Sequence, residues 1–373
     1  MKILYLTSSI TSSDFALLEE KASVKPNPAG QNFHQRLIHA LAKFAEVHVF
    51  SLVPNRERIL EEKAFEEDGI HYTYINPVNG KIQQALFGTS NIAKRLDGKF
   101  DVVIYDSLSL TLASASKAIA KKTNAVRVAV CTDSPFNITG ANSFYQKQVL
   151  SLSSKAEGYF CLTHGLDSLF NKNGKPSLIK PGIAERIEVL ASPHPRPYFY
   201  YGGALFIKDG TKALIDAYEG SNADYDLVIA GHGNYEEEVK RASMSDPRIR
   251  FLGQISKKEN AAYEANADLL INPRLYRKEL DEVSIPSKLL EYLALGRRIV
   301  STKSSDLQAI FSDEINWLED GLELSAFLNA HLDESGKLYG IKENTGKEKV
   351  LDLLGFEAIG RDFTEFLQKL VRP

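Results

Sequence analysis

Polar side chains at positions 287, 288 and 291 could together hold an anionic ligand rich in hydroxyl groups. They belong to the segment 284–296, which reads SIPSKLLEYLALG. Its serine and proline predict the start of a helix, and its last glycine predicts the end before a buried strand. Ser287 and Lys288 lie four and three residues before Glu291, so the three share one helical face, while leucines form an apolar stripe toward a sheet.

Lys288 is poorly placed for a helix that binds nothing. A lysine in the first turn opposes the helix macrodipole, and a lysine three residues before a glutamate is the less favourable order for an ion pair. A phosphate at the helix N-terminus would remove both objections. We therefore predict a phosphate site in the first turn, at Pro286, Ser287, Lys288 and Leu289, with Glu291 accepting hydrogen bonds from hydroxyl groups one turn deeper.

These residues carry a resemblance to a known family. The run SIPSKLLEYLALGRRIVST is similar to the donor-nucleotide helix of family 4 glycosyltransferases with the GT-B fold, in the subgroup written S-x-P-S-K-L-L-E-Y. In that family a Glu, seven residues and a second Glu mark this helix, and the second Glu contacts the ribose hydroxyls of the sugar nucleotide. The resemblance assigns that contact to Glu291. The first acidic position falls at Val283, which is not acidic; Glu282 and Asp281 lie beside it, and Glu282 is the candidate for the donor-sugar contact.

Basic residues are candidates for binding the donor diphosphate. In the family, a Gly-Arg-x5-Lys-Gly stretch opens the C-terminal domain, and its Arg and Lys contact the diphosphate. The corresponding stretch here is GGALFIKDG, in which Lys208 matches the lysine, while Gly203 and Ala204 stand where the arginine is expected. Solvated surface is the alternative for Lys208. Arg274, just past a predicted strand end, is the candidate for a compensating cation, with structural ion pairing as its alternative.

Further turns of the C-terminal half are weaker candidates. Gly231-His232-Gly233 lacks the third glycine of a dinucleotide fingerprint, and the glutamates that follow would repel a pyrophosphate. We interpret it as a tight turn, with His232 as a possible donor contact. The segment that contains Gln254 and Ile255 resembles the part of the family that binds the nucleotide base through backbone groups.

The N-terminal half offers Gly30 and Asp133. The segment 27–32 resembles the glycine-bearing entry to the family's first helix, where Gly30 could let backbone approach the donor; the alternative is a glycine needed only for the turn. Asp133 follows a predicted buried strand, where many family members carry a histidine that touches the donor sugar. A carboxylate there could bind a sugar hydroxyl, act as a general base, or merely cap the turn.

The role of Asp133 bears on stereochemistry. A base on the acceptor side would permit inversion by direct displacement, whereas the resemblance implies retention by front-face attack assisted by the leaving diphosphate. No Asp-x-Asp motif accompanies these residues, so we expect no metal and no cofactor, and we expect Lys208, Lys288 and the helix N-terminus to meet the leaving-group charge.

Length and alternation predict two doubly wound α/β domains facing a cleft. The 373 residues exceed what one core usually serves. Short apolar runs alternate with helical patterns in two series, which we place at 1–190 and 199–353. Between them, 191–198 is a proline-rich linker, and 354–373 predicts a terminal helix that packs back on the first domain.

Charge and cysteine use indicate a soluble cytoplasmic protein. The net charge of −3 argues against a nucleic-acid binder. No stretch approaches a transmembrane span, the N-terminus lacks a signal peptide, and Cys131 and Cys161 fall in apparent buried strands. The segment 81–99 mixes apolar residues with Lys94, Arg95 and other basic residues; it could lie on an anionic membrane, or it could be an ordinary amphipathic helix.

The combined interpretation is a peripheral GT-B enzyme of cell-surface glycan assembly. The resemblance implies transfer of a hexose from a nucleoside diphosphate sugar, with a UDP-sugar as the expected donor, to a glycan or polyprenyl-diphosphate-linked acceptor. Two alternatives stay open, a nucleotide-sugar epimerase and a non-catalytic donor-binding subunit. An NAD-dependent oxidoreductase fits poorly, because no glycine follows the first strand.

Overall fold

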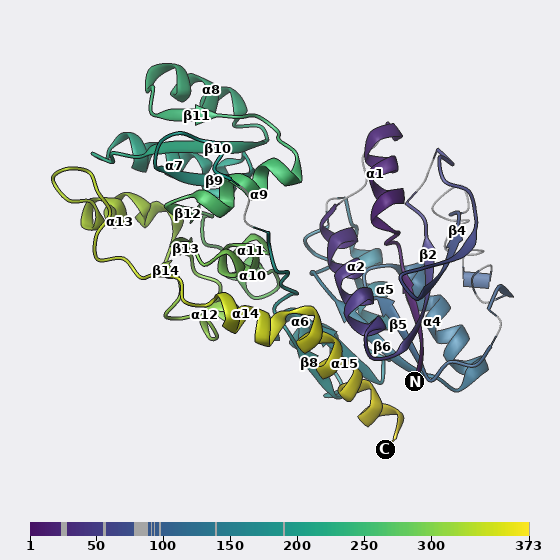
Figure 1. Ribbon diagram of the computed structural model, residues 1–373. Helices are drawn as coiled ribbons and strands as arrows, with labels where there is room; N and C mark the ends of the chain where they lie inside the picture. The colour runs from purple at the N-terminus through teal and green to yellow at the C-terminus, as the bar shows by residue number, and fades with distance from the viewer. Residues whose placement is uncertain are drawn as a thin grey trace. The chain divides into compact units, whose positions relative to one another are not determined.

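The computed structural model describes residues 1–23, 28–54, 57–77, 89–90, 92, 94–96, 98–138, 140–188 and 191–372. The chain divides into two compact α/β units (Figure 1). Unit 1 consists of Met1–Ile183, Glu282–Ser284 and the C-terminal segment from Leu354; unit 2 consists of Ala184–Asp281 and Ile285–Leu353. The chain therefore carries two Rossmann-like domains, as the alternation of apolar runs predicts.

Unit 1 is built on an eight-stranded sheet with the strand order β3-β4-β2-β1-β5-β6-β7-β8. All neighbouring pairs are parallel except β3 with β4. The strands are β1 (Lys2–Thr7), β2 (Glu46–Leu52), β3 (Ala64–Glu67), β4 (Ile70–Ile75), β5 (Val102–Asp106), β6 (Val126–Cys131), β7 (Gly158–Cys161) and β8 (Ser177–Ile179). The six inner strands consist mostly of buried residues, as expected for a parallel sheet covered on both faces, whereas the edge strands β3 and β8 contain no buried residue.

Helices connect these strands. They are α1 (Ser12–Lys21), α2 (Pro28–Ala42), α4 (Leu110–Thr123), α5 (Ser143–Ser153), α6 (His164–Phe170) and α15 (Phe356–Val371). Helix α15 packs against α2, and a Cβ atom at Gly360 would lie 2.1 Å from the backbone oxygen of Ala40, so this crossing needs a glycine. An ion pair between Lys180 and Asp362 also holds α15 in unit 1.

Unit 2 is built on a six-stranded, all-parallel sheet with the order β11-β10-β9-β12-β13-β14. The strands are β9 (Tyr198–Ala204), β10 (Asp226–His232), β11 (Ile249–Phe251), β12 (Leu269–Asn272), β13 (Ile299–Thr302) and β14 (Asn316–Leu318). The helices are η1 (Ile207–Asp209), α7 (Thr211–Glu219), α8 (Glu236–Ser245), α9 (Lys257–Asn266), α10 (Lys278–Asp281), α11 (Lys288–Leu295), α12 (Ser305–Gln308), η2 (Gly321–Glu323), α13 (Leu324–His331) and α14 (Lys347–Leu354).

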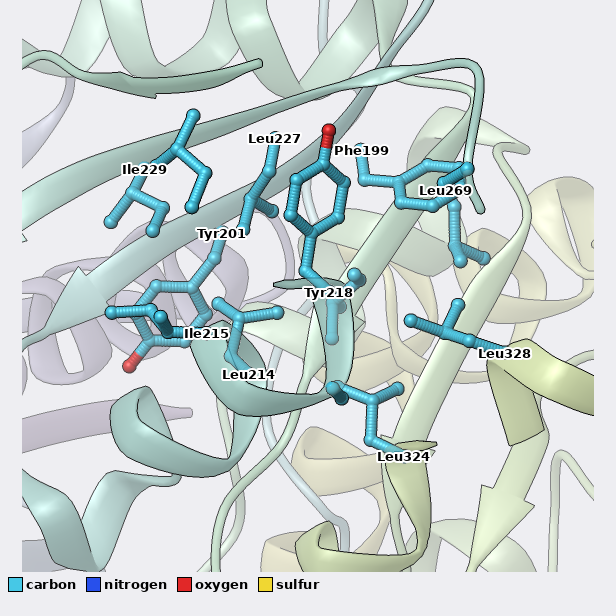
Figure 2. Packing of buried hydrophobic residues seen from close by; sticks show 14 of the residues in the cluster. Phe199, Tyr201, Leu214, Ile215, Tyr218, Leu227, Ile229, Leu269, Leu324 and Leu328 are labelled. Carbon is cyan, nitrogen blue, oxygen red and sulfur yellow. The ribbon is translucent and has the colours of Figure 1, made fainter. Parts of the chain in front are cut away.

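The core of unit 2 lies between the sheet and helices α7 and α13. Figure 2 shows side chains of α7 packed against strands β9 and β10, with Leu324 and Leu328 of α13 beside them. Aliphatic residues make up most of this core, and Phe199 and Tyr225 stack within it with ring centroids 4.7 Å apart. The core fixes strand β9, whose carboxyl end carries the candidate site.

The boundary between the units differs from the sequence expectation. It lies between Ile183 and Ala184 instead of at 190, and the proline-rich segment belongs to unit 2. The reason is a polar anchor: the ring of His194 lies 2.8 Å from the carboxylate of Asp226, which is buried, and Arg196 pairs with Asp224. A segment held in this way is part of the domain and not a free linker.

Two predictions about the rest of the chain can be compared with the structure. Cys131 and Cys161 are free and buried, as the sequence indicates. Among the described residues, no helix combines the length and the apolar character that crossing a membrane requires. The segment 81–99, for which a membrane-bound segment and an ordinary amphipathic helix are the two alternatives, falls largely outside the described residues.

Candidate functional site

The carboxyl ends of the strands of unit 2 gather most of the predicted nucleotide-binding residues. Gly203 lies at the end of β9, His232 ends β10 directly beside Ala204, and Arg274 follows β12. Because every strand pair of this sheet is parallel, these ends lie at one edge, where ligands bind in open α/β sheets.

A close approach of backbones explains the glycines at this edge. Gly231 has a φ of +145°, and a Cβ atom there would lie 1.8 Å from the backbone oxygen of Gly203. Its N–H donates to the backbone oxygen of Gly253 at 2.8 Å. His232 is exposed and lies 2.8 Å from Glu236 on α8. The tight-turn interpretation of this segment is therefore sufficient to account for its glycines, and the donor contact of His232 stays a prediction.

Lys288 reaches from α11 to the end of β9. Its Nζ donates to the backbone oxygen of Gly202 at 2.8 Å and lies 4.6 Å from the ring centre of Tyr201. A Cβ atom at Gly203 would lie 2.3 Å from this Nζ. Burial lowers the pKa of Lys288, while the neighbouring Glu264 carboxyl group raises it. The lysine thus lies against backbone at the same edge that the sequence predicts for the donor diphosphate.

The first turn of α11 differs from the expected geometry. The helix begins at Lys288, after a tight turn in which the N–H of Leu289 donates to the backbone oxygen of Pro286 at 2.9 Å. Ser287 already has helical dihedral angles and provides no side-chain cap. The N–H of Leu289 is therefore engaged within the turn, and Ser287 and Lys288 are the candidate backbone donors to a ligand.

Glu264 is a component of the site that the sequence analysis missed. This residue of α9 is buried, and burial raises its pKa to about 8, with the carboxylate of Glu291 as a further cause. Asn260 and Lys288 lower this pKa. Asn260 also accepts a hydrogen bond at 2.7 Å from Tyr200, a neighbour of Gly202. The alanines of α9 indicate close packing, but they do not reveal which polar side chain is buried.

Glu291 is half-buried one turn into α11, as predicted. Its influence on the pKa values of Lys288 and Glu264 places the three ionisable groups in one electrostatic cluster. The protonation states of a buried glutamate, a lysine and a second carboxylate depend on one another when the groups interact. A bound anionic ligand would shift their pKa values.

The remaining cations of unit 2 differ in exposure. Lys208, on η1, is exposed, with its Nζ 5.5 Å from the ring centre of Phe206. Arg274 is partly buried, and burial lowers its pKa, whereas Asp281 and Asp209 raise it. Asp281 and Asp209 therefore interact electrostatically with Arg274, so structural charge pairing stays an alternative, and the contact of Arg274 with a diphosphate stays a prediction.

The predicted base-binding segment follows β11. Gly253 has a φ of +68°, Gln254 is exposed, and Ile255 is half-buried. The backbone oxygen of Gly253 accepts a hydrogen bond from the N–H of Gly231, which holds this loop at the carboxyl edge of the sheet. The contact between the backbone of this loop and a nucleotide base stays a prediction.

Three aspartates of unit 2 have structural roles. The buried Asp281 accepts from the backbone N–H and the hydroxyl group of Ser305 and so fixes the start of α12. The sequence does contain an Asp-x-Asp pattern, at 224–226, but it lies at the amino end of β10. There its carboxylates pair with Arg196, Lys337 and His194, so it is an ion-pair network and not a metal motif beside the predicted site.

Glu282 belongs to unit 1, whereas Asp281 belongs to unit 2. The backbone oxygen of Glu282 accepts from Thr163 Oγ1 at 2.7 Å, and a Cβ atom at Gly165 would lie 2.0 Å from it. Its side chain is exposed. The sequence grouped Glu282 with the residues of α11, but its backbone is held by the start of α6.

In unit 1, Asp133 follows β6 and organises a turn. Its Oδ1 accepts from the N–H of Ser134 at 2.6 Å and from the side chain of Asn137 at 2.8 Å. One carboxylate oxygen of Asp133 therefore caps the turn, as one of the alternatives from the sequence predicts. The two roles are compatible, because a carboxylate has a second oxygen for a sugar hydroxyl or a proton.

Gly30 lies within the first turn of α2 and is exposed, and a Cβ atom at this position would have nothing within 4 Å. The neighbouring Gln31 is buried and binds the loop after β1, since its side chain accepts from the N–H of Ile10 at 3.0 Å. The helix entry and the first strand are thus joined through a side chain. No contact in the described part of unit 1 explains a glycine at position 30.

Unit 1 also contains a buried polar chain that sequence reasoning missed. Tyr5 and His34 Nδ1 are 2.8 Å apart, and His34 Nε2 lies 3.8 Å from Asp106 at the carboxyl end of β5. Burial lowers the pKa of His34, and Asp106 raises it. A histidine on the apolar face of a helix gives no signal of such partners in the sequence.

Comparisons with known proteins agree with this arrangement. Residues 196–330 match the family model described as "Glycosyl transferases group 1". The D-rhamnosyltransferase WbpZ of Pseudomonas aeruginosa is 27% identical over 144 residues, which is 38% of this chain and 34% of that protein. The matched region therefore spans about a third of the length of this curated relative.

Solved structures show the same architecture over nearly the whole chain. The apo form of the lipopolysaccharide outer core galactosyltransferase WaaB has a TM-score of 0.68 and 15% identity, with 99% of each chain covered. Sucrose-phosphate synthase from Thermosynechococcus elongatus has a TM-score of 0.69 and 14% identity, again with 99% of each chain covered. HepE of Anabaena in complex with UDP has a TM-score of 0.63 and 14% identity, with 99% of this chain and all of that chain covered.

The match to the family model falls on the part of unit 2 that holds β9 and α11, where the predicted nucleotide-binding residues gather. The structural matches extend to both units and show the fold. The chain therefore has the GT-B fold, and its residues 196–330 match the glycosyl transferases group 1 family.

Proposed function

We propose that this protein transfers a hexose from a nucleoside diphosphate sugar to a hydroxyl group of a glycan or lipid-linked acceptor. The observation that carries this proposal is the position of Lys288, partly buried at the carboxyl end of β9, with the N-terminus of α11 beside it. A lysine and helix N–H groups at that edge suit a diphosphate. Solved structures of HepE with UDP and with UDP-glucose support a uridine nucleotide as the donor to test first.

The electrostatics of unit 2 favour a leaving group with negative charge. Lys288 and Arg274 are both partly withdrawn from water, and burial lowers the pKa of each, because a buried cation needs a nearby negative charge to compensate for its lost hydration. An added diphosphate would supply that compensation. We propose that these cations and Lys208 stabilise the departing diphosphate without a metal ion.

The proposed reaction retains the anomeric configuration, as the family 4 resemblance implies. The bond between the anomeric carbon and the diphosphate oxygen breaks, and the acceptor oxygen bonds to that carbon from the same face. The acceptor proton passes to the diphosphate oxygen that leaves. In this scheme Asp133 binds a sugar hydroxyl; if Asp133 instead removes the acceptor proton, the product is inverted.

Exposed aromatic side chains of unit 1 support an acceptor with an apolar part. Phe136 is 57% exposed in the Asp133 turn, and Phe144 on α5 is 70% exposed. Both belong to unit 1. We propose a lipid-linked glycan as the acceptor and a cytoplasmic enzyme that works at the inner face of the cell membrane. Salt-sensitive flotation of the chain with anionic vesicles would test the membrane contact, and its absence at low ionic strength would contradict it.

A panel of nucleotides tests the donor class directly. UDP, GDP, ADP and TDP, each with its sugar derivatives, should be compared by thermal shift, because a ligand that binds only the folded state raises its stability. We expect one nucleoside diphosphate to raise the unfolding temperature and the matching nucleoside to have a smaller effect. If none of the diphosphates shifts the transition, the proposed function is wrong.

A non-catalytic donor-binding subunit is the second candidate. Two observations favour it: Gly203 and Ala204 stand where the family's arginine is expected, and Glu282 is held in unit 1 by its backbone. Hydrolysis or transfer of the donor sugar by the isolated chain would dismiss this candidate. Binding without turnover over a range of acceptors would favour it.

A further inference from the structure

A cluster of metal-binding side chains lies on one face of the sheet of unit 1, apart from the candidate site. Glu46 and His48 are two residues apart on β2, so they point to the same face. His71 on β4 is the register partner of His48, and Glu66 on β3 is the register partner of His71. Three adjacent strands thus bring two imidazoles and two carboxylates together.

The distances within this cluster are those of groups that can share one ion. The ring of His48 lies 2.7 Å from Oε1 of Glu46, and the rings of His48 and His71 stack with centroids 4.5 Å apart. One ligand atom from each of Glu46, His48 and His71 lies within 4.8 Å of the others. Nδ1 of His71 lies 3.4 Å from Oε2 of Glu66, so a fourth ligand adjoins these three.

From this geometry we propose that Glu46, His48 and His71 bind a divalent transition metal ion, zinc above all, with Glu66 as the fourth ligand. Imidazole nitrogens and carboxylate oxygens are usual zinc ligands at about 2.0 to 2.2 Å, which places ligand atoms of a tetrahedral site about 3.3 Å apart. The ligand atoms of Glu46, His48 and His71 lie within 4.8 Å of one another, so metal binding requires side-chain rotations that bring these atoms closer together.

Solvent access allows an ion to enter. The side chains of His48 and His71 are 22% and 44% exposed, and those of Glu46 and Glu66 are 51% and 59% exposed. The backbone beneath them is regular sheet, which holds the four Cα atoms in place. The site is therefore partly preorganised, and only exposed ends of side chains must adjust.

One cation competes for this site. Nζ of Lys2 lies 3.0 Å from Oε1 of Glu46, the oxygen that also contacts His48. A metal ion would have to displace this ammonium group or use the other oxygen of Glu46. Removal of the lysine charge should therefore strengthen metal binding, whereas removal of a ligand should weaken it.

The location indicates a structural ion and not a catalytic one. Glu46 is the first residue of β2, so the cluster lies toward the amino ends of the parallel strands, while Asp133 follows the carboxyl end of β6. An ion bound here would join β2, β4 and β3, where β3 forms the edge of the sheet. This inference is independent of the proposed sugar transfer and of whether that reaction uses a metal.

Titration of the metal-free full-length chain with zinc tests the assignment. Isothermal calorimetry should show one zinc ion per chain, with affinity reduced at least about tenfold in His48→Gln and His71→Gln. His331→Gln is the matched control, because His331 is a partly exposed histidine of unit 2 that hydrogen-bonds the backbone of Tyr339. The control variant should bind zinc like the wild-type chain.

Cobalt provides a second measurement that does not depend on the histidine variants. Co²⁺ in a tetrahedral nitrogen and oxygen site should give visible absorption bands that are lost in Glu46→Gln, a change of an exposed side chain that leaves the sheet intact. Lys2→Met should bind zinc several-fold more tightly. Circular dichroism checks that each variant is folded. If the wild-type chain takes up no stoichiometric zinc, or if zinc binds equally well to His48→Gln and His71→Gln, the assignment is wrong.

Discussion

Gly203 leaves the space that Lys288 occupies. A Cβ atom at Gly203 would lie 2.3 Å from Nζ of Lys288, which donates to the backbone oxygen of the preceding residue, Gly202. The resemblance places an arginine near this strand end in related sequences, and here a lysine from α11, 86 residues away in the chain, fills the adjacent space. The position of this ammonium group is therefore linked to the absence of a side chain at Gly203.

Gly203→Ala should displace Lys288 and weaken binding of the nucleoside diphosphate by about tenfold, because a charge-assisted contact contributes roughly 1.5 to 3 kcal/mol. The flexible end of the lysine can move, so unfolding should change little. Gly231→Ala is the contrast, since its Cβ atom would meet backbone at 1.8 Å and its φ is +145°. That variant should lose stability, by about 1 to 3 kcal/mol. Equal nucleotide affinity in Gly203→Ala and wild type would contradict the link.

Lys288→Ala and Lys208→Ala should each lose more affinity for the nucleoside diphosphate than for the bare nucleoside. The reason is that both cations are proposed to contact phosphate and neither contacts the base. Calorimetric titration of each variant with both ligands checks this. Equal losses for the two ligands would show that these lysines do not bind phosphate. Lys212→Ala, whose lysine pairs with Asp216 on the exposed face of α7, is a control of equal charge.

Glu291→Gln should weaken binding or turnover of the sugar nucleotide by about tenfold or more, because a carboxylate that accepts from ribose hydroxyls contributes roughly 1.5 to 3 kcal/mol. The variant should retain the unfolding temperature of the wild-type chain. Comparison of the ribonucleotide with its 2′-deoxy form gives a sharper measurement. The deoxy form should lose affinity only in the wild-type chain, and a similar loss in both proteins would remove Glu291 from the ribose site.

Glu264 should make unit 2 less stable as the pH rises. Its pKa is about 8 in the folded chain against 4.5 in the reference state, so the folded chain binds more protons between these values. The stability that the protonated Glu264 contributes to the fold is therefore fully present below pH 4.5 and is lost as the pH rises through about 8. Glu264→Gln should gain stability relative to wild type between pH 5 and pH 9, by at least about 1 kcal/mol.

Denaturant unfolding at several pH values measures this difference. Glu291→Gln should lower the midpoint of the Glu264 transition, because the Glu291 carboxylate helps to raise the pKa of Glu264. If the free energy of unfolding depended on pH in the same way in the wild-type chain and in Glu264→Gln, Glu264 would be ionised in the folded chain.

Asp133→Asn separates chemistry from turn formation. The amide oxygen can still accept from Ser134 and Asn137, so the turn should persist, whereas the negative charge is lost. We expect turnover to fall by about a hundredfold if the carboxylate acts on a hydroxyl group. Asp133→Ala should in addition cost about 1 kcal/mol of stability through the loss of the turn bonds. Full activity in the Asn variant would limit Asp133 to the turn.

Much of the fold could be predicted because its signals are local. The apolar runs of the sequence at 102–105, 227–230 and 269–272 fall within β5, β10 and β12, and the helical pattern at 257–266 is α9. Alternation of short buried strands with helices suffices for a doubly wound domain, since connections between parallel strands follow fixed rules. The same alternation could not reveal that His194 ties the proline-rich segment to unit 2, because Asp226 lies 32 residues further along.

The candidate site likewise combines features that the sequence predicts with features that only the packed structure shows. The sequence by itself determined that Ser287, Lys288 and Glu291 share the start of one helix, because a helical period of 3.6 residues fixes which neighbours lie together. Only the tertiary structure decided that Lys288 meets Gly202, that Glu264 is buried beside both charges, and that the backbone of Glu282 belongs to unit 1. These contacts join residues distant in the chain, and their energies depend on burial, which is a property of the packed domain and not of any local pattern.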